Sequence, residues 1–180
     1  EDFNAPATIM FYDIEVEVDL KQNRGYPSVS DPFGAICAIS MYHSKHKSYI
    51  MLIPQEYSNV ELEDEYENLP VEVVFTHNEK EMLEIFAELL DDVAVLTGWN
   101  SSAFDLPYII ARAKIIFGER KALSMFCRDG YPASKRDFTN SFGNDEVAYT
   151  LVGINEIDML QVYKKIKMGE KPSFSLSAIA

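Results

Sequence analysis

The sequence contains little cysteine, no long apolar run and no secretion signal. Its two cysteines, Cys37 and Cys127, have no motif spacing, so neither a disulfide framework nor a cysteine-based zinc site is indicated. No apolar run reaches the length of a transmembrane helix, and the N-terminal residues lack the basic and apolar regions of a signal peptide. We therefore expect a soluble, intracellular protein from a reducing compartment, with no membrane partner.

Basic residues are also scarce, but their scarcity is uneven along the chain. The formal net charge is −13, which argues at first against a nucleic-acid partner, because affinity for a phosphate backbone depends largely on Lys and Arg. Residues 1–111 carry 5 Lys and Arg against 21 Asp and Glu, whereas residues 112–180 carry 11 against 8. The second half of the chain can therefore face phosphates.

Apolar residues are abundant enough for a core, since 47% of the 180 residues are hydrophobic and 12% are aromatic. A chain of this length is typical of one domain, here residues 1–180. Alternating apolar residues predict strands, and apolar residues three or four apart predict helices, in an α/β order. The predicted strands cover residues 11–18, 35–42, 47–53, 71–75 and 93–97. The first predicted helix begins with a capping box of Thr76 and Glu79 and continues to Leu90, and two further helices cover 108–117 and 155–167. A β-hairpin is predicted over 135–151.

Two of the three histidines, His43 and His46, lie at the polar tip between two predicted strands. Neighbouring histidines can bind a metal ion, but a site needs at least a third ligand. No third ligand is near them in the sequence, so we expect an exposed turn.

The segment around which the chain is organised is the predicted strand 11–18. Successive side chains of a strand point to opposite sides, so Asp13, Glu15 and Glu17 share one face, with neighbouring carboxylates about 6–7 Å apart. Such crowding favours a bound cation. A half-buried strand with a solvated acidic face shows the same alternation, so a second carboxylate must decide between the two interpretations.

Asp105 is the candidate for that second carboxylate. Gly98 ends a short apolar strand, and Pro107 suits the first turn of the helix that follows. Asp105 therefore lies between the carboxyl end of a strand and a helix N-terminus, where open α/β sheets bind their ligands. The alternative is an aspartate that only caps the helix.

Three blocks of residues together resemble a known family. They are Phe11-Tyr12-Asp13-Ile14-Glu15; Thr97-Gly98-Trp99-Asn100 with Phe104-Asp105-Leu106-Pro107-Tyr108; and Asp158 to Lys165 followed by Ser173-Phe174-Ser175-Leu176. In this order they resemble the 3′-to-5′ proofreading exonuclease domain of family B DNA polymerases, closest to phage replicative polymerases of the T-even kind. The resemblance extends over residues 9–180.

The resemblance implies an RNase H-like α/β fold, a mixed sheet flanked by helices. It also implies that Asp13, Glu15 and Asp105 are the catalytic, metal-ligating carboxylates of a two-metal site for Mg²⁺ or Mn²⁺, an assignment that agrees with the preference of hard cations for oxygen ligands. The implied reaction is hydrolysis of the 3′-terminal phosphodiester of single-stranded or mispaired primer DNA. Asn100 and Phe104 match positions near the substrate strand, although Phe104 is equally a candidate core aromatic.

The same resemblance implies partners. They are the primer 3′ end, a polymerase domain in the parent protein, and a sliding clamp or other replisome proteins in the host cytoplasm of a phage. It also implies that the hairpin 135–151 helps to part primer from template.

One departure concerns the family's third motif, a tyrosine followed four residues later by an aspartate. No such pair occurs after Tyr149. Asp145 or Asp158 is a substitute in principle, but we expect Asp158 to cap a helix. We therefore expect an incomplete exonuclease domain that is weakly active or inactive alone. The alternatives are a non-catalytic module that binds single-stranded DNA or a protein, and an RNase H-like nuclease acting on RNA.

Overall fold

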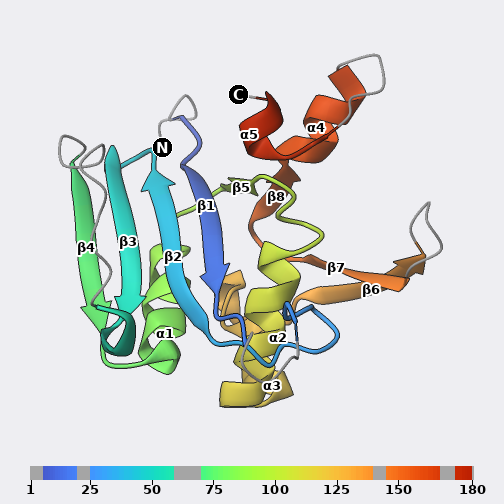
Figure 1. The fold of residues 1–180 in the computed structure, drawn as a ribbon. Coiled ribbons are helices and arrows are strands. Elements are labelled where there is room, and N and C mark those ends of the chain that lie inside the picture. Colours follow the sequence, from blue (N-terminus) through green and yellow to red (C-terminus); the bar gives the residue numbers. More distant parts are fainter. Residues whose placement is uncertain (1–5, 20–24, 59–69, 140–144, 167–172, 180) are drawn as a thin grey trace.

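A six-stranded mixed sheet forms the centre of the computed structural model, which describes residues 6–19, 25–58, 70–139, 145–166 and 173–179. The strand order is β4-β3-β2-β1-β5-β8, so that β1 lies in the middle (Figure 1). Neighbours β1, β2 and β3 are antiparallel, whereas β4 runs parallel to β3, and β5 and β8 continue parallel to β1. The strands of this sheet are β1 (Ile9–Val16), β2 (Ile36–His43), β3 (Ser48–Pro54), β4 (Val71–Thr76), β5 (Val95–Gly98) and β8 (Asn155–Asp158).

Helices lie against the sheet and beyond its β8 edge (Figure 1). No helix among the described residues is both long and apolar enough to cross a membrane. The helices are α1 (Glu79–Leu89), α2 (Asp105–Phe117), α3 (Glu119–Ser124), α4 (Met159–Ile166) and α5 (Leu176–Ile179), with 3-10 turns η1 (Gln55–Tyr57) and η3 (Arg128–Gly130). This confirms the predicted fold class, a mixed sheet flanked by helices.

Strand β1 separates the core from the open face of the sheet. Met10, Tyr12 and Ile14 are buried, and the alternate residues Asp13 and Glu15 are exposed. This is the alternation that the sequence predicts, because successive side chains of a strand point to opposite faces. The register with β2 shifts between Glu15 and Val16, which ends the regular alternation there.

Helix α1 covers the buried face with Met82, Leu83 and Phe86, all fully buried. Each such side chain contributes about 1.5–3 kcal/mol of burial free energy. The ring of Phe86 packs against Tyr12 of β1, with centroids 5.9 Å apart, and against Phe126 at 6.1 Å. Together with buried residues of β2, β3 and α2, these side chains form the core.

The predicted capping box at the start of α1 is wrong. The cap is Asn78, whose side chain accepts a hydrogen bond from the Glu81 backbone N–H at 3.1 Å. Thr76 instead donates its hydroxyl to the Asn78 carbonyl oxygen. Glu79 points into the protein, where its carboxylate pairs with Arg112.

The helix predicted over residues 155–167 is wrong in its first four residues. Residues 155–158 form β8, which pairs in parallel with β5, and α4 begins only at Met159. The parallel neighbour, not the local pattern, decides the conformation of this segment.

The predicted hairpin is confirmed. Strands β6 (Ser134–Thr139) and β7 (Asp145–Thr150) form a separate antiparallel two-stranded sheet that extends away from the main sheet (Figure 1). Its predicted tip, at Gly143, falls outside the described residues.

Candidate active site

Asp13 and Glu15 lie on the open face of β1, the central strand of the sheet. Desolvation is the main cause that raises the pKa of Asp13, and desolvation together with the charge of Asp13 raises the pKa of Glu15. The two carboxylates therefore lie near enough to one another to repel. Glu17 lies beyond the end of β1 and has a hydrogen-bond partner, because Tyr57 donates its hydroxyl to the Glu17 carboxylate at 3.3 Å.

Asp105 reaches the same strand from α2. β5 pairs with β1 only from Ile9 to Phe11, so the β1 backbone beyond this point has no partner strand on that side. The first residue of α2 fills the position, since Asp105 Oδ1 accepts a hydrogen bond from the Ile14 backbone N–H at 3.2 Å. Ile14 is the residue between Asp13 and Glu15. The three carboxylates thus converge on one segment of β1.

Asp105 is not the cap of α2. Phe104 occupies the cap position, and no side-chain hydrogen bond caps the helix there. Burial, and after it the negative charge of Asp13, raise the pKa of Asp105 to about 7. An aspartate with 4% exposure whose pKa lies this high is poised to accept a cation in place of a proton.

The donor set fits a hard divalent cation. Within the described part of the chain, no Lys or Arg forms an ion pair with Asp13, Glu15 or Asp105. Three carboxylates with raised pKa values and no basic partner form a centre of uncompensated negative charge when ionised. Oxygen-only ligands of this kind suit Mg²⁺ or Mn²⁺.

Asn100 lies in the loop between β5 and α2 with a left-handed backbone, φ 63°, a conformation that asparagine tolerates better than most residues. Its N–H donates to Asp158 Oδ1 at 3.1 Å, and its carbonyl accepts from the N–H of Ala103 and of Phe104. The backbone of this loop is therefore held firmly. The Asn100 side chain is partly exposed beside it.

Phe104 is also partly exposed. Its ring stacks on Tyr108 with centroids 5.2 Å apart, and it packs against the edge of the core. The structure therefore gives Phe104 a packing role and leaves part of its surface accessible.

Asp158 is a helix cap, as expected. Its Oδ1 accepts from the N–H of Leu160 at 2.8 Å, and its Oδ2 accepts from the Ser102 hydroxyl at 2.7 Å. These bonds join the start of α4 to the loop that carries Asn100. Because both of its oxygens accept hydrogen bonds and the residue is only 6% exposed, Asp158 has a structural role. Asp145, the other substitute considered, begins β7 in the separate hairpin sheet.

Three contacts around this loop were not expected from the sequence. Trp99 Nε1 donates to the Phe174 carbonyl oxygen at 3.0 Å, and its ring meets Tyr163 edge-on at 5.9 Å. Ser101 donates its hydroxyl to Glu156 Oε1 at 2.7 Å. The second and third sequence blocks are thus adjacent in space, a proximity that only their shared family resemblance could have indicated.

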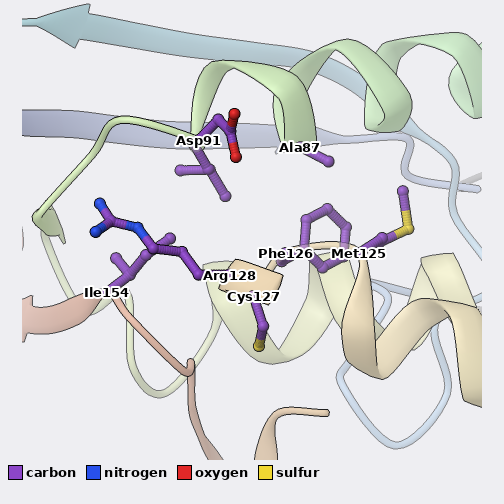
Figure 2. A pocket seen from close by; sticks show the side chains of 8 residues that line it. Ala87, Asp91, Met125, Phe126, Cys127, Arg128 and Ile154 are labelled. Carbon is purple, nitrogen blue, oxygen red and sulfur yellow. The ribbon is translucent and has the colours of Figure 1, made fainter. Parts of the chain in front are cut away.

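A small cleft lies elsewhere, between α1 and the segment after α3 (Figure 2). Arg128 crosses it and donates from its guanidinium to the Val93 carbonyl oxygen at 2.8 Å. None of the three carboxylates lines this cleft, so it is separate from the candidate active site. Its lining residues are Ala87, Leu90, Asp91, Met125, Phe126, Cys127, Arg128 and Ile154.

The mixed sheet with a carboxylate-bearing central strand is consistent with an exonuclease domain of the RNase H-like type. The family model described as DNA polymerase family B, exonuclease domain, matches residues 1–179. The chain therefore belongs to the family B DNA polymerase exonuclease domains.

Two phage proteins, both named DNA-directed DNA polymerase, are similar to this chain. The protein of Enterobacteria phage T4 is 39% identical over 105 residues, which cover 57% of this chain and 11% of the T4 protein. The protein of Escherichia phage RB69 is 30% identical over 187 residues, which cover 91% of this chain and 20% of the RB69 protein. The chain thus spans a fifth or less of the length of these relatives.

Proposed function

We propose that the chain carries the proofreading exonuclease site of a DNA polymerase. Water attacks the 3′-terminal phosphodiester of a primer strand, the bond from phosphorus to the 3′ oxygen breaks, and a nucleoside 5′-monophosphate leaves. The observation that supports this best is the hydrogen bond from Ile14 to Asp105, since it brings the carboxylate of α2 to the segment of β1 that bears Asp13 and Glu15.

Asp13, Glu15 and Asp105 would hold two divalent ions, Mg²⁺ or Mn²⁺. Such ions supply activation of a water molecule and stabilisation of the leaving oxygen. The chain contributes two carboxylates on the open face of β1 and a third, buried carboxylate from the start of α2. Burial raises the pKa of all three carboxylates, and the negative charge of Asp13 raises the pKa of Glu15 and Asp105 further.

Asn100 and Phe104 are proposed to position the primer end. Asn100 is partly exposed on a loop whose backbone is held by hydrogen bonds, and the accessible part of Phe104 can stack on a base. Lys164 and Lys165, on α4 directly after Asp158, supply positive charge for phosphates. The β6–β7 hairpin is proposed to help separate primer from template.

The parent activity and partners belong to the same proposal. Both relatives are named DNA-directed DNA polymerase. We infer that the chain works within such a polymerase, with single-stranded primer DNA as its substrate and a sliding clamp or other replisome proteins as partners of the parent.

The test is release of nucleoside monophosphate from 3′-labelled single-stranded DNA with Mg²⁺ or Mn²⁺. The family resemblance puts a further tyrosine and aspartate on the C-terminal side of Ala180, so the assay compares this chain with a longer polypeptide that carries them. In the longer polypeptide, Asp13→Ala should reduce the rate at least about a thousandfold, because several kcal/mol of charge stabilisation are lost.

Glu84→Ala is the matched control, since Glu84 is a carboxylate of α1 whose ion pair with Lys121 is exposed and which has no proposed contact with DNA. It should leave the rate within about twofold. A 3′-blocked oligonucleotide should resist cutting, and an RNA strand tests sugar preference. If the longer polypeptide binds DNA but releases no nucleotide, the alternative of a non-catalytic binding module is correct.

A further inference from the structure

A second group of potential metal ligands lies apart from the carboxylates. His43 ends β2, His46 lies in the turn that follows, and Asp92 follows α1. One ring nitrogen of each histidine and one oxygen of Asp92 all lie within 4.8 Å of one another. The expected exposed turn is wrong for His43, which is the last residue of β2 and is buried. The third potential ligand, Asp92, lies 49 residues further along the chain, where the sequence does not show its proximity.

The contacts within this group are close. His43 Nε2 lies 3.1 Å from Asp92 Oδ1, and the rings of His43 and His46 lie 4.5 Å apart between centroids. His43 is buried, with 1% exposure, whereas His46 is exposed and Asp92 is partly exposed. One side of the group is therefore buried, and the other side is accessible to solvent.

The start of β1 holds both segments in place. Ile9 exchanges two hydrogen bonds with Ser44, which follows His43, at 2.8 and 2.9 Å. The Thr8 carbonyl oxygen accepts from the N–H of Ala94 and of Val95, just after Asp92. The three side chains therefore come from backbone that is fixed without any ion, and a preorganised site loses little ordering entropy on binding.

We propose that His43, His46 and Asp92 bind one divalent transition-metal ion, Zn²⁺ by preference, with a fourth position open to water. Two imidazole nitrogens and one carboxylate oxygen form a donor set that zinc uses in sites with three protein ligands. Nitrogen ligands disfavour Mg²⁺, which prefers oxygen. This site therefore selects a different ion from the oxygen-only carboxylates of the candidate active site.

The geometry allows tetrahedral binding after a small adjustment. Bonds of about 2.0–2.1 Å around a tetrahedral zinc put ligand atoms about 3.3–3.4 Å apart. The nitrogen of His43 and the oxygen of Asp92 already have nearly this separation. The ring nitrogen of His46 must move closer to the other two ligand atoms, by rotation of its exposed side chain in the turn.

The two ring nitrogens of His43 differ in their surroundings. Nδ1 is buried and has no hydrogen-bond partner among the described residues. Nε2 faces Asp92 Oδ1, so Nε2 is the nitrogen that binds the ion in this arrangement, and Asp92 is a direct ligand beside it.

Lys45 is the basic group that faces the site. Its Nζ lies 2.5 Å from Asp92 Oδ2, the carboxylate oxygen that does not contact His43. Lys45 therefore occupies one oxygen and leaves the other for the ion.

The site would join the β2–β3 turn to the segment that leads into β5. Because His43 pairs with Met10, a buried residue of β1, it lies on the helix-covered face, opposite to Asp13 and Glu15. The zinc proposal is thus independent of the exonuclease proposal. Binding of zinc at this site is expected to stabilise the fold.

The test is calorimetric titration of Zn²⁺ into the chain with Asp13→Asn, Glu15→Gln and Asp105→Asn, which remove the other carboxylate site. We expect one equivalent of Zn²⁺ to bind and the melting temperature to rise. Co²⁺ should give the visible absorption of a four-coordinate complex. His46→Ala and Asp92→Asn, added singly, should each weaken binding by about 10–100-fold or more. Both positions are at least partly exposed, so the variants should fold.

His77→Ala is the matched control, because His77 is the remaining histidine and pairs with Glu81 at the start of α1. It should bind Zn²⁺ as tightly as its parent. Zinc affinity that is unchanged by His46→Ala, equal losses in the His77 control, or no binding at millimolar Zn²⁺ would each overturn the proposal.

Discussion

Asp105 Oδ1 accepts a hydrogen bond from the backbone N–H of Ile14 across 91 positions of the sequence. This bond places a carboxylate from the start of α2 beside the two that β1 carries. It also satisfies a backbone donor of β1 that β5 does not reach. One hydrogen bond therefore completes the edge of a strand and assembles the candidate active site.

The raised pKa of Asp105 predicts how the stability of the metal-free chain depends on pH. In the unfolded chain this group titrates near pH 4, and in the folded chain at about 7. Between these values the folded state binds the extra proton, so stability should fall as pH rises, by on the order of 1–3 kcal/mol between pH 5 and 8. Urea denaturation in EDTA measures this slope.

Asp105→Asn should flatten the slope, because an amide does not titrate but still accepts the bond from Ile14. The raised pKa values of Asp13 and Glu15 leave a smaller slope of the same sign. Asp137→Asn, at an exposed site, should retain the full slope. Equal slopes for the two variants would show that Asp105 is not the titrating group.

Asp158→Ala should destabilise the chain by about 2–4 kcal/mol, because it removes a helix cap and leaves the N–H groups of Asn100 and Leu160 without their acceptor. Asp158→Asn keeps one acceptor oxygen and should cost less. Chemical denaturation gives both values. Mn²⁺ affinity of the candidate active site should be unchanged in Asp158→Asn, and a large loss would mean that Asp158 is a metal ligand after all.

Glu79→Ala should lower the free energy of unfolding by about 3–5 kcal/mol, because it leaves the Arg112 guanidinium without its carboxylate partner and the Arg112 side chain is only 12% exposed. The Ile36 backbone N–H, 2.9 Å from Glu79 Oε1, also loses its partner. Glu84→Ala breaks the exposed pair with Lys121 and should cost less than about 1 kcal/mol. Unfolding free energies that are equal for the two variants would contradict the buried role of Glu79.

Gly98→Ala should disturb both the fold and the site. A Cβ atom there would lie 2.6 Å from the Tyr12 carbonyl oxygen and 3.0 Å from Ser101 Cβ, so β5 must move away from β1. We expect a loss of about 1–3 kcal/mol from overpacking and weaker Mn²⁺ binding, measured by electron paramagnetic resonance.

Gly118→Ala is the comparison for this substitution. No atom lies within 4 Å of the added Cβ, and only the positive φ of +82° opposes it. A backbone cost of about 1–3 kcal/mol is expected there, because φ 82° with ψ 157° is a conformation that essentially only glycine adopts, with unchanged Mn²⁺ binding. Similar metal binding by both variants would argue against the contact between Gly98 and Tyr12.

Local patterns predicted the parts of the fold that depend on neighbouring residues. The alternation around Asp13 and Glu15 correctly predicted a strand with its acidic face exposed, because side-chain direction in a strand follows directly from sequence position. The hairpin of β6 and β7 was predictable because two strand-like segments surround the turn residues Gly143 and Asn144.

Local patterns failed where a distant partner decides the conformation. Residues 155–158 have apolar positions that suit a helix, yet Asn155 to Asp158 pair with β5. Thr76 and Glu79 match a capping box, yet Arg112 draws the Glu79 carboxylate into the interior. In both cases tertiary contacts outweigh a propensity of a few tenths of a kcal/mol per residue.

The sequence by itself determined the strand that bears Asp13 and Glu15, the strand-to-helix junction at Asp105, and the family to which these blocks belong. Only the tertiary structure decided that Asp105 bonds to Ile14 rather than capping its helix, and that Asp92 meets His43 and His46. The physical reason is that periodicity records which face a side chain occupies. Which distant group meets it there depends on how the elements pack.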